Sequence, residues 1–116
     1  MTVFLATKQS GSTLFLAGLV GREPDLSPSI GIGYQTERIF ARLTKILDTH
    51  QIGLANVVNI KISLVDVTAW KEAVFPIVDK LFNGTVPPCT VVGVSALVEE
   101  WMEIEIEVVA SLTVEP

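Results

Sequence analysis

The feature that most constrains the fold is a strict alternation of apolar and acidic residues near the end of the chain, from Met102 to Val108. Successive side chains point to opposite faces of a β-strand, so this pattern predicts a strand with one apolar face. The opposite face carries three glutamates, Glu103, Glu105 and Glu107. Like charges repel, so this face must meet water, a cation or a polar cavity. Two readings stay open: a solvated outer face, or a face on which at least one glutamate lines a pocket.

Similar patterns divide the rest of the chain into strands and helices. Apolar residues at every second position predict strands, and the i, i+3, i+4 spacing predicts amphipathic helices. We expect strands at Val3–Thr7, Leu14–Gly18, Val57–Val65, Cys89–Val94 and Trp101–Thr113, and helices at Tyr34–Thr49 and from Asp66 or Thr68 to Leu81. Gln9 to Ser12 suits the turn of a hairpin between the first two strands. Pro76 should kink the second helix unless the helix restarts there.

This β-β-α-β-α-β-β order predicts one α/β (α+β) domain over residues 1–116, with a mixed sheet and both helices on one face of it. The other face of the sheet would then be uncovered in a monomer. Hydrophobic residues make up 49% of the chain and charged residues only 18%. Such a surplus of apolar residues in a small chain favours a homo-oligomer, in which a second copy covers the apolar surface.

Composition also argues against several classes of function. The formal net charge is −5, and the eight lysines and arginines form no basic run, so we expect no nucleic-acid partner. No apolar run reaches the length of a membrane helix and no signal peptide is recognisable, so we expect no membrane partner. A single cysteine points to a reducing, cytoplasmic compartment. The chain has one histidine and no CxxC motif, so we expect no metal site. It has no Gly-rich phosphate-binding loop, so we also expect no cofactor.

Five segments, in order, resemble the RidA/YjgF family of enamine and imine deaminases, formerly named L-PSP endoribonucleases. Leu14 to Gly18 is similar to the family's "iyxSG" strand, and Gln35-Thr36 to the "QT" of its first helix. Val57 to Asp66 is similar to "dVVkxxvfLtD". Pro87 to Val94, followed by Glu103-Ile104-Glu105, is similar to "PaRsxvxV…vEIEa". The resemblance covers nearly the whole chain.

The resemblance implies a chorismate-mutase-like fold that forms a homotrimer, with the sheets packed into a central barrel and small-molecule clefts between subunits. It also implies hydrolysis of 2-imino or enamine acids to 2-keto acids and ammonia. That chemistry needs a guanidinium to hold the substrate carboxylate and an acidic side chain to position water.

Residue by residue, the resemblance predicts one retained catalytic group and several altered ones in the cleft. Glu103 falls at the water-positioning glutamate, whereas Cys89 stands where the deaminases have the carboxylate-binding arginine. The remaining predicted cleft residues are Ala17 in place of a serine, Phe75 near a helix asparagine and Val91 at a frequent cysteine. Tyr34 and the preceding loop, Gly21 to Gly33, either cover the cleft or form a plain surface loop. Without the arginine clamp, a 2-imino carboxylate is not expected to be held in the usual way.

Two of these residues have alternative readings. Cys89 is either a nucleophile with a stabilised thiolate or a small apolar residue of its strand. Glu103 either positions water or is a buried glutamate that is hydrogen-bonded across a subunit boundary.

Three functions follow, in order of preference. The first is hydrolysis of a C=N bond in a small substrate other than the usual 2-imino acids. The second is a non-catalytic protein of the same fold that binds a small ligand or serves in assembly. The third is RNA cleavage, which the acidic composition opposes.

Overall fold

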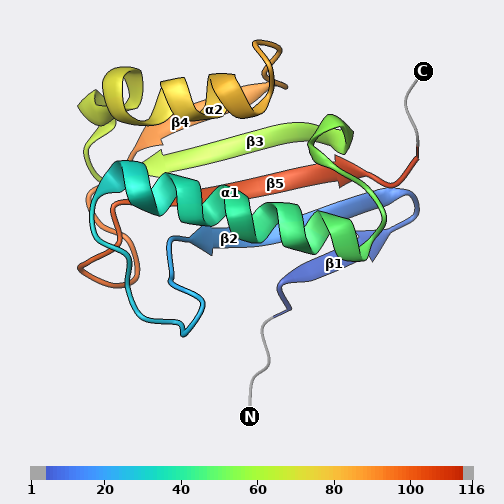
Figure 1. Cartoon of the computed structure of the whole chain (residues 1–116), viewed down its shortest axis with the longest axis horizontal. Coiled ribbons are helices and arrows are strands. Elements are labelled where there is room, and N and C mark those ends of the chain that lie inside the picture. The colour runs from blue at the N-terminus through green and yellow to red at the C-terminus, as the bar shows by residue number, and fades with distance from the viewer. Residues whose placement is uncertain (1–4, 114–116) are drawn as a thin grey trace.

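The computed structural model describes residues 5–113, which form one five-stranded mixed sheet with two α-helices (Figure 1). The strands are β1 (Thr7–Ser10), β2 (Thr13–Val20), β3 (Val57–Leu64), β4 (Cys89–Gly93) and β5 (Ile104–Ser111), and the helices are α1 (Ile32–Thr49) and α2 (Phe75–Leu81). The strands lie in the order β1-β2-β5-β3-β4. All neighbours are antiparallel except β3 and β4, which are parallel. The predicted α+β class is confirmed.

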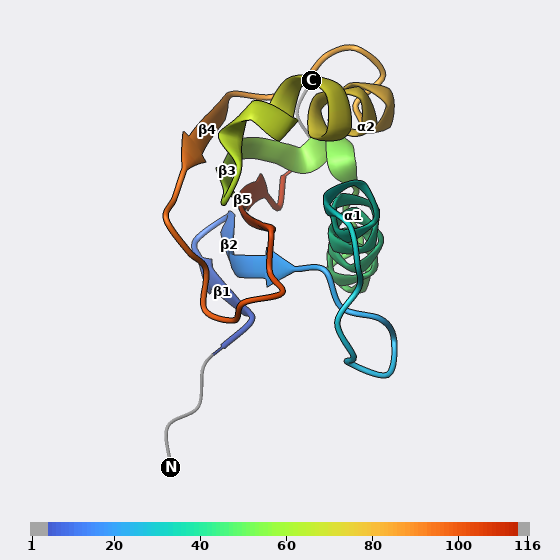
Figure 2. The same cartoon turned by 90° about the vertical axis from the view of Figure 1, so that its left-hand side faces the viewer.

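Both helices cover the same face of the sheet, as Figure 2 shows. Helix α1 forms there because its apolar residues recur with helical spacing and pack on the sheet: Ile39, Phe40, Leu43 and Leu47 are all buried. The sheet contributes alternate residues to the same core, among them Ile60 and Ile62 of β3 and Ile104 and Ile106 of β5. Among the described residues, no helix lies on the opposite face, as predicted.

The second helical region is continuous from Val67 to Leu81 but changes its geometry twice. A 3₁₀ turn (Val67–Ala69) leads into a π-helical turn (Trp70–Val74) and then into α2. Asp66 caps its start, because the Asp66 carboxylate accepts a hydrogen bond from the Thr68 N–H at 3.1 Å. Pro76 lies in the first turn of α2, where its missing N–H leaves no bond unmade. Regular α-helix therefore begins afresh at Phe75, directly before the proline, which agrees with the expected restart.

Two strands differ from the sequence prediction by three or more residues at one end or both. The first strand was expected at Val3–Thr7, of which Val3 and Phe4 lie outside the described residues, but β1 begins only at Thr7. Ser10 pairs with Thr13, so the turn is Gly11-Ser12, with Gly11 at a φ of 60°. The last strand, expected at Trp101–Thr113, is shorter, and β5 begins at Ile104. As a result Glu103 precedes the strand, while Glu105 and Glu107 lie within it.

Candidate functional site

The uncovered face of the sheet holds a close approach between β2 and β5. The Glu105 side chain lies directly against Gly18, so that a Cβ added at residue 18 would overlap the Glu105 carboxylate. Opposite this point the pairing of β2 with β5 is irregular, with a register shift between Leu16 and Leu19. Bulges of this kind redirect side chains locally. Gly18 therefore makes the space in which the Glu105 carboxylate rests.

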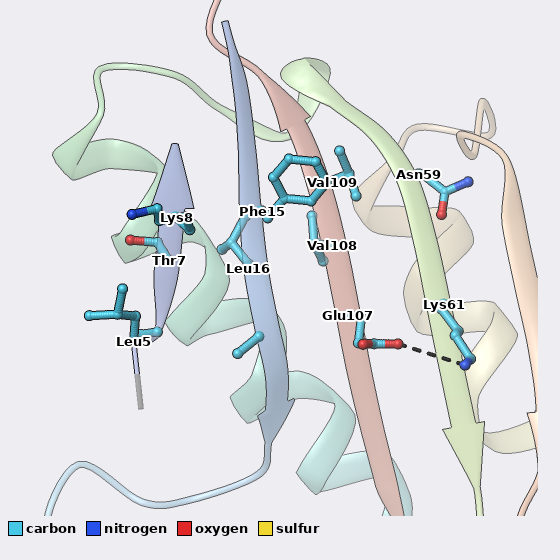
Figure 3. Close-up of a pocket in the computed structure, with 12 residues that line it drawn as sticks. Leu5, Thr7, Lys8, Phe15, Leu16, Asn59, Lys61, Glu107, Val108 and Val109 are labelled. Carbon is cyan, nitrogen blue, oxygen red and sulfur yellow. Dashed lines mark ion pairs between the residues drawn. The ribbon is translucent and has the colours of Figure 1, made fainter. Parts of the chain in front are cut away.

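Next to this contact a cavity of about 430 Å³ opens on the same face. Figure 3 shows Phe15 and Val109 beside each other at its centre, between β2 and β5. Farther along β5, the Glu107 carboxylate faces the Lys61 ammonium of β3 at 3.9 Å, and both side chains are about half exposed. Ala17 also lines the cavity. The cavity thus combines an apolar floor with one ion pair.

The structure places Glu103 at the rim of the fold, held by a buried amide of α1. Gln35 is 1% exposed, and its side-chain oxygen accepts the Glu103 backbone N–H at 2.9 Å. The Gln35 Nε2 donates to the carbonyls of Ser29 and Trp101, both at 3.0 Å. It also lies 3.4 Å from Glu103 Oε2. Gln35 therefore joins three segments that are far apart in sequence and fixes the chain that enters β5.

Cys89 and Val91 lie on the helix-covered face of the sheet. They pair in register with Ile60 and Ile62 of β3, which are fully buried, and both pack against the core. Burial raises the pKa of the Cys89 thiol, because a thiolate is poorly solvated there. This placement agrees with the reading of Cys89 as a small apolar strand residue.

Phe75 and Tyr34 lie near the two helix starts, where each has a local partner. The Phe75 ring lies 5.5 Å from the Trp70 ring across the change from π-helix to α2. The Tyr34 hydroxyl donates to both carboxylate oxygens of Glu23, at 2.8 and 3.0 Å. Of the six predicted site residues, Ala17 alone is among the described residues that line the cavity. The roles predicted for all six residues stay predictions.

Sequence reasoning did not single out Glu105, although a signal was present. The triplet Glu-Ile-Glu occurs twice in overlap, at 103–105 and at 105–107, so the family pattern fits this segment in two registers. The contact of Glu105 with Gly18, next to Ala17, distinguishes the two registers in space. No linear pattern contains that information, because β2 and β5 are distant in the chain.

Chemically, the uncovered face offers carboxylates, two ammonium groups, those of Lys8 and Lys61, and an apolar floor. A carboxylate beside an apolar surface can hold a water molecule and accept its proton. Within residues 5–113, no three His, Cys, Asp or Glu side chains are grouped so that they could hold a metal ion. Within the same part of the chain, no helix has the length and apolar character needed to cross a membrane.

The fold closely resembles several solved structures. Yeast Mmf1 superposes with a TM-score of 0.87 at 24% identity, over 96% of this chain and 88% of Mmf1. RidA from an Antarctic Psychrobacter gives 0.87 at 22% identity, over 95% and 89%. A YjgF/YER057c/UK114 family member from Mycobacterium tuberculosis gives 0.80 at 25% identity, over 91% and 84%.

No match was found among proteins of curated function. At the level of sequence families, residues 3–112 match the family described as Endoribonuclease L-PSP, which is nearly the whole chain. The chain therefore belongs to the endoribonuclease L-PSP family, the family of the RidA and YjgF proteins.

Proposed function

We propose that this protein hydrolyses the C=N bond of a small imine or enamine on the uncovered face of its sheet, and that the substrate is not held by a carboxylate clamp. The observation that carries the proposal is the Glu105 carboxylate lying against Gly18, beside the cavity that Ala17 lines. Membership in a family that includes proteins named RidA supports C=N hydrolysis as the class of reaction.

The reaction needs one proton acceptor and one water molecule. The glutamate accepts a proton from water as the water oxygen bonds to the carbon of the C=N group, and it passes this proton to the nitrogen. In the collapse of the resulting adduct the glutamate relays the hydroxyl proton to the nitrogen in the same way, the C=O bond forms, the C–N bond breaks and ammonia leaves, so that the glutamate ends as a carboxylate. Water and imine thus yield a carbonyl compound and ammonia.

Two carboxylates compete for this role. The family resemblance favours Glu103, which precedes β5 and whose backbone N–H is bound by Gln35. The geometry favours Glu105, because it lies within β5 and against Gly18 on the face that bears the cavity. We therefore assign water positioning to Glu105 and keep Glu103 as the rival that the experiment must separate.

The substrate is proposed to lack a carboxylate or not to depend on one. Cys89 occupies the position of the family's arginine, and it packs on the helix-covered face of the sheet. A thiol supplies no bidentate hydrogen bonds to a carboxylate. The Lys61 ammonium is about half exposed and already faces Glu107, so it is a weaker anchor than a free arginine.

We further propose that the protein acts as a homotrimer, with subunits packed over the uncovered faces. Phe15, 47% exposed, and the apolar cavity floor beside it support this, because a large aromatic side chain at the centre of a sheet face gains from being covered. Light scattering after gel filtration should give three times the chain mass of 12.6 kDa. Phe15→Glu should lower that mass, whereas Phe82→Leu, on the helix side, should leave it unchanged.

The decisive assay compares two imine classes made in situ, 2-imino acids from an amino-acid oxidase and neutral imines from an amine oxidase. We expect ammonia release from neutral imines to be accelerated more than release from 2-imino acids. Glu105→Gln should reduce the rate about 10²-fold or more, while Glu72→Gln, at an exposed position of the second helical region, serves as the control. Loss of activity in Glu103→Gln with Glu105→Gln unaffected would instead assign the role to Glu103.

A non-catalytic function in ligand binding or assembly is the second candidate. It is favoured by the placement of Cys89 and Val91 against the core, because β4 then turns neither residue toward the uncovered face. Absence of turnover with both imine classes, in a protein that retains its fold and assembly, would establish this alternative over the first.

A further inference from the structure

A second pocket, unrelated to the uncovered face, lies between α1 and the loop that leads into it. This pocket, which we call the basic pocket, has a volume of about 250 Å³. Its charged walls are Arg22, Glu23, Arg38, Arg42 and Lys45, and its apolar walls are Pro24, Leu26 and Ala41. Figures 1 and 2 show the loop after β2 projecting beside the first half of α1, on the side of the molecule that carries the helices.

The charge of this pocket is opposite to that of the protein. The whole chain has a formal net charge of −5 and contains eight basic residues. Four of them line this one pocket, against a single glutamate. Arg38, Arg42 and Lys45 share one side of α1, because their spacing of four and three residues brings them close together on a helix. Such a concentration of one sign in a concave site focuses the electrostatic field and attracts counter-ions.

The loop side of the pocket is held in a defined shape. The Leu26 N–H donates to the Glu23 carbonyl at 2.8 Å, and the Glu23 N–H donates to the Ser27 carbonyl at 2.8 Å. The Asp25 carboxylate accepts both the backbone N–H and the hydroxyl of Ser27, at 3.0 and 2.6 Å. Asp25 is thereby engaged within its own turn, and its pKa is lowered by these bonds.

Two of the four cations, Arg22 and Arg38, are positioned by contacts. Arg22 donates to the Leu26 carbonyl at 3.0 Å, pairs with Glu99 at 2.5 Å, and lies 4.9 Å above the Trp101 ring. Arg38 lies 3.9 Å from the Glu23 carboxylate. Within residues 5–113, Arg42 and Lys45 form no ion pair. The pocket therefore has more positive charge than its own acid can balance.

We propose that the basic pocket binds a small phosphorylated compound. Arginine and lysine side chains that converge from a helix and a loop can donate several hydrogen bonds to one tetrahedral phosphate group. The apolar walls formed by Pro24, Leu26 and Ala41 suit a short carbon body attached to that phosphate. The volume suits a small molecule, and no reaction in this pocket is implied.

The pocket is also connected to the chain that enters β5. Arg22 stacks on Trp101, and the Trp101 carbonyl is bound by Gln35, which holds the Glu103 backbone as well. A phosphate that recruits Arg22 competes with Glu99 for the guanidinium and changes the environment of the Trp101 ring. Trp101 fluorescence therefore reports binding directly in a Trp70→Phe protein, because the chain has two tryptophans.

The test uses pyrophosphate and phosphoserine as probes at low ionic strength, with Trp101 fluorescence and calorimetry as readouts. The Arg42→Gln/Lys45→Gln double variant should weaken binding by at least about tenfold, because two charge-assisted contacts are lost. Glutamine keeps good helix propensity at both sites, so the fold should persist. The matched control, Lys71→Gln/Lys80→Gln, removes two charges from the second helical region and should leave the affinity unchanged.

A second variant is expected to bind the probes more tightly instead of more weakly, and a folding defect cannot produce that result. Glu23→Gln removes the only acid of the pocket yet keeps an acceptor for the Tyr34 hydroxyl, and it should tighten binding severalfold. Equal affinity in the wild type and the Arg42→Gln/Lys45→Gln variant would overturn the proposal. So would binding of RNA that strengthens with its length and is not displaced by pyrophosphate, because that result identifies a nucleic-acid surface.

Discussion

The Glu105 carboxylate lies against the Cα of Gly18, where any β-carbon would overlap it. Two strands that are distant in the chain meet here, and the smallest residue of β2 faces an acidic residue of β5. The absence of a side chain at Gly18 leaves room for the Glu105 carboxylate and so determines its position on the uncovered face.

Gly18→Ala should displace the Glu105 side chain while changing stability little. The atoms that a new Cβ would meet belong to the outer part of a flexible side chain, which can rotate away. We expect a loss of about 1 kcal/mol or less in the free energy of unfolding. Urea unfolding measures that loss, and a crystal structure of the variant would show the moved carboxylate. An unmoved carboxylate would contradict the assigned contact.

Gly21→Ala should be much more damaging than Gly18→Ala. A Cβ at residue 21 would lie 2.6 Å from the Cα of Gln35, and this backbone atom cannot rotate away. We expect a destabilisation of about 1–3 kcal/mol or more. Gly53→Ala is the matched control, since nothing lies within 4 Å of its added Cβ. Similar unfolding midpoints for the Gly21 and Gly53 variants would refute the close packing of the loop on α1.

Gln35→Ala should destabilise the protein by about 2–4 kcal/mol. The change removes the partners of two carbonyls and of the Glu103 N–H, and buried groups without partners are costly. Thr44→Ala is a suitable comparison, because the Thr44 hydroxyl donates only to the Phe40 carbonyl of its own helix. We expect less than about 0.5 kcal/mol there. Equal losses in the two variants, measured in urea, would exclude Gln35 as the link between the three segments.

Tyr34 offers a titration that reports one contact. Its hydrogen bond to the Glu23 carboxylate, the largest cause, raises the pKa of Tyr34, because a phenolate cannot donate and would face a negative charge. Glu23→Gln should therefore lower the pKa of Tyr34 toward the ordinary value of 10.0. Ultraviolet titration is unambiguous, since the chain has one tyrosine. Glu37→Gln, which removes a weaker charge effect, should produce a smaller decrease, and the reverse order would contradict the contact.

Cys89 should react slowly with iodoacetamide. Burial raises the pKa of its thiol above the ordinary value of 9.0, so the thiolate fraction at neutral pH is small. The folded protein should be labelled more slowly than the same protein unfolded in urea. Because the pKa of the Cys89 thiol is higher in the folded than in the unfolded protein, the protonated thiol favours the folded state. This contribution to stability is complete at a pH below the pKa of the thiol in the unfolded protein, and it is lost as the pH rises through the pKa of the thiol in the folded protein. Faster labelling of the folded protein would restore the nucleophile reading.

Most elements could be predicted because their periodicity reflects burial. The helix expected at Tyr34–Thr49 and the strand expected at Val57–Val65 differ from α1 and β3 by two residues or fewer at either end. The first strand could not be placed in this way. Its four residues are polar and mostly exposed at the sheet edge, so they leave no apolar pattern to read.

The candidate site was less accessible to prediction than the fold. Alternation places Glu105 and Glu107 on one face of β5, but it does not tell which of them meets Gly18. That depends on the register between β2 and β5, including its irregularity near Gly18. Likewise, only the pairing of Cys89 with the buried Ile60 shows which face of the sheet Cys89 occupies.

Strand β5 lies between β2 and β3 in the sheet, although it follows every other strand in the chain. During synthesis, β2 and β3 leave the ribosome without the strand that must separate them, and their unpaired edges face each other. Productive folding therefore has to wait for β5. Until β5 arrives, the nascent chain depends on not pairing β2 directly with β3, and a chain stopped before Ile104 is expected to aggregate instead of forming a smaller version of the fold.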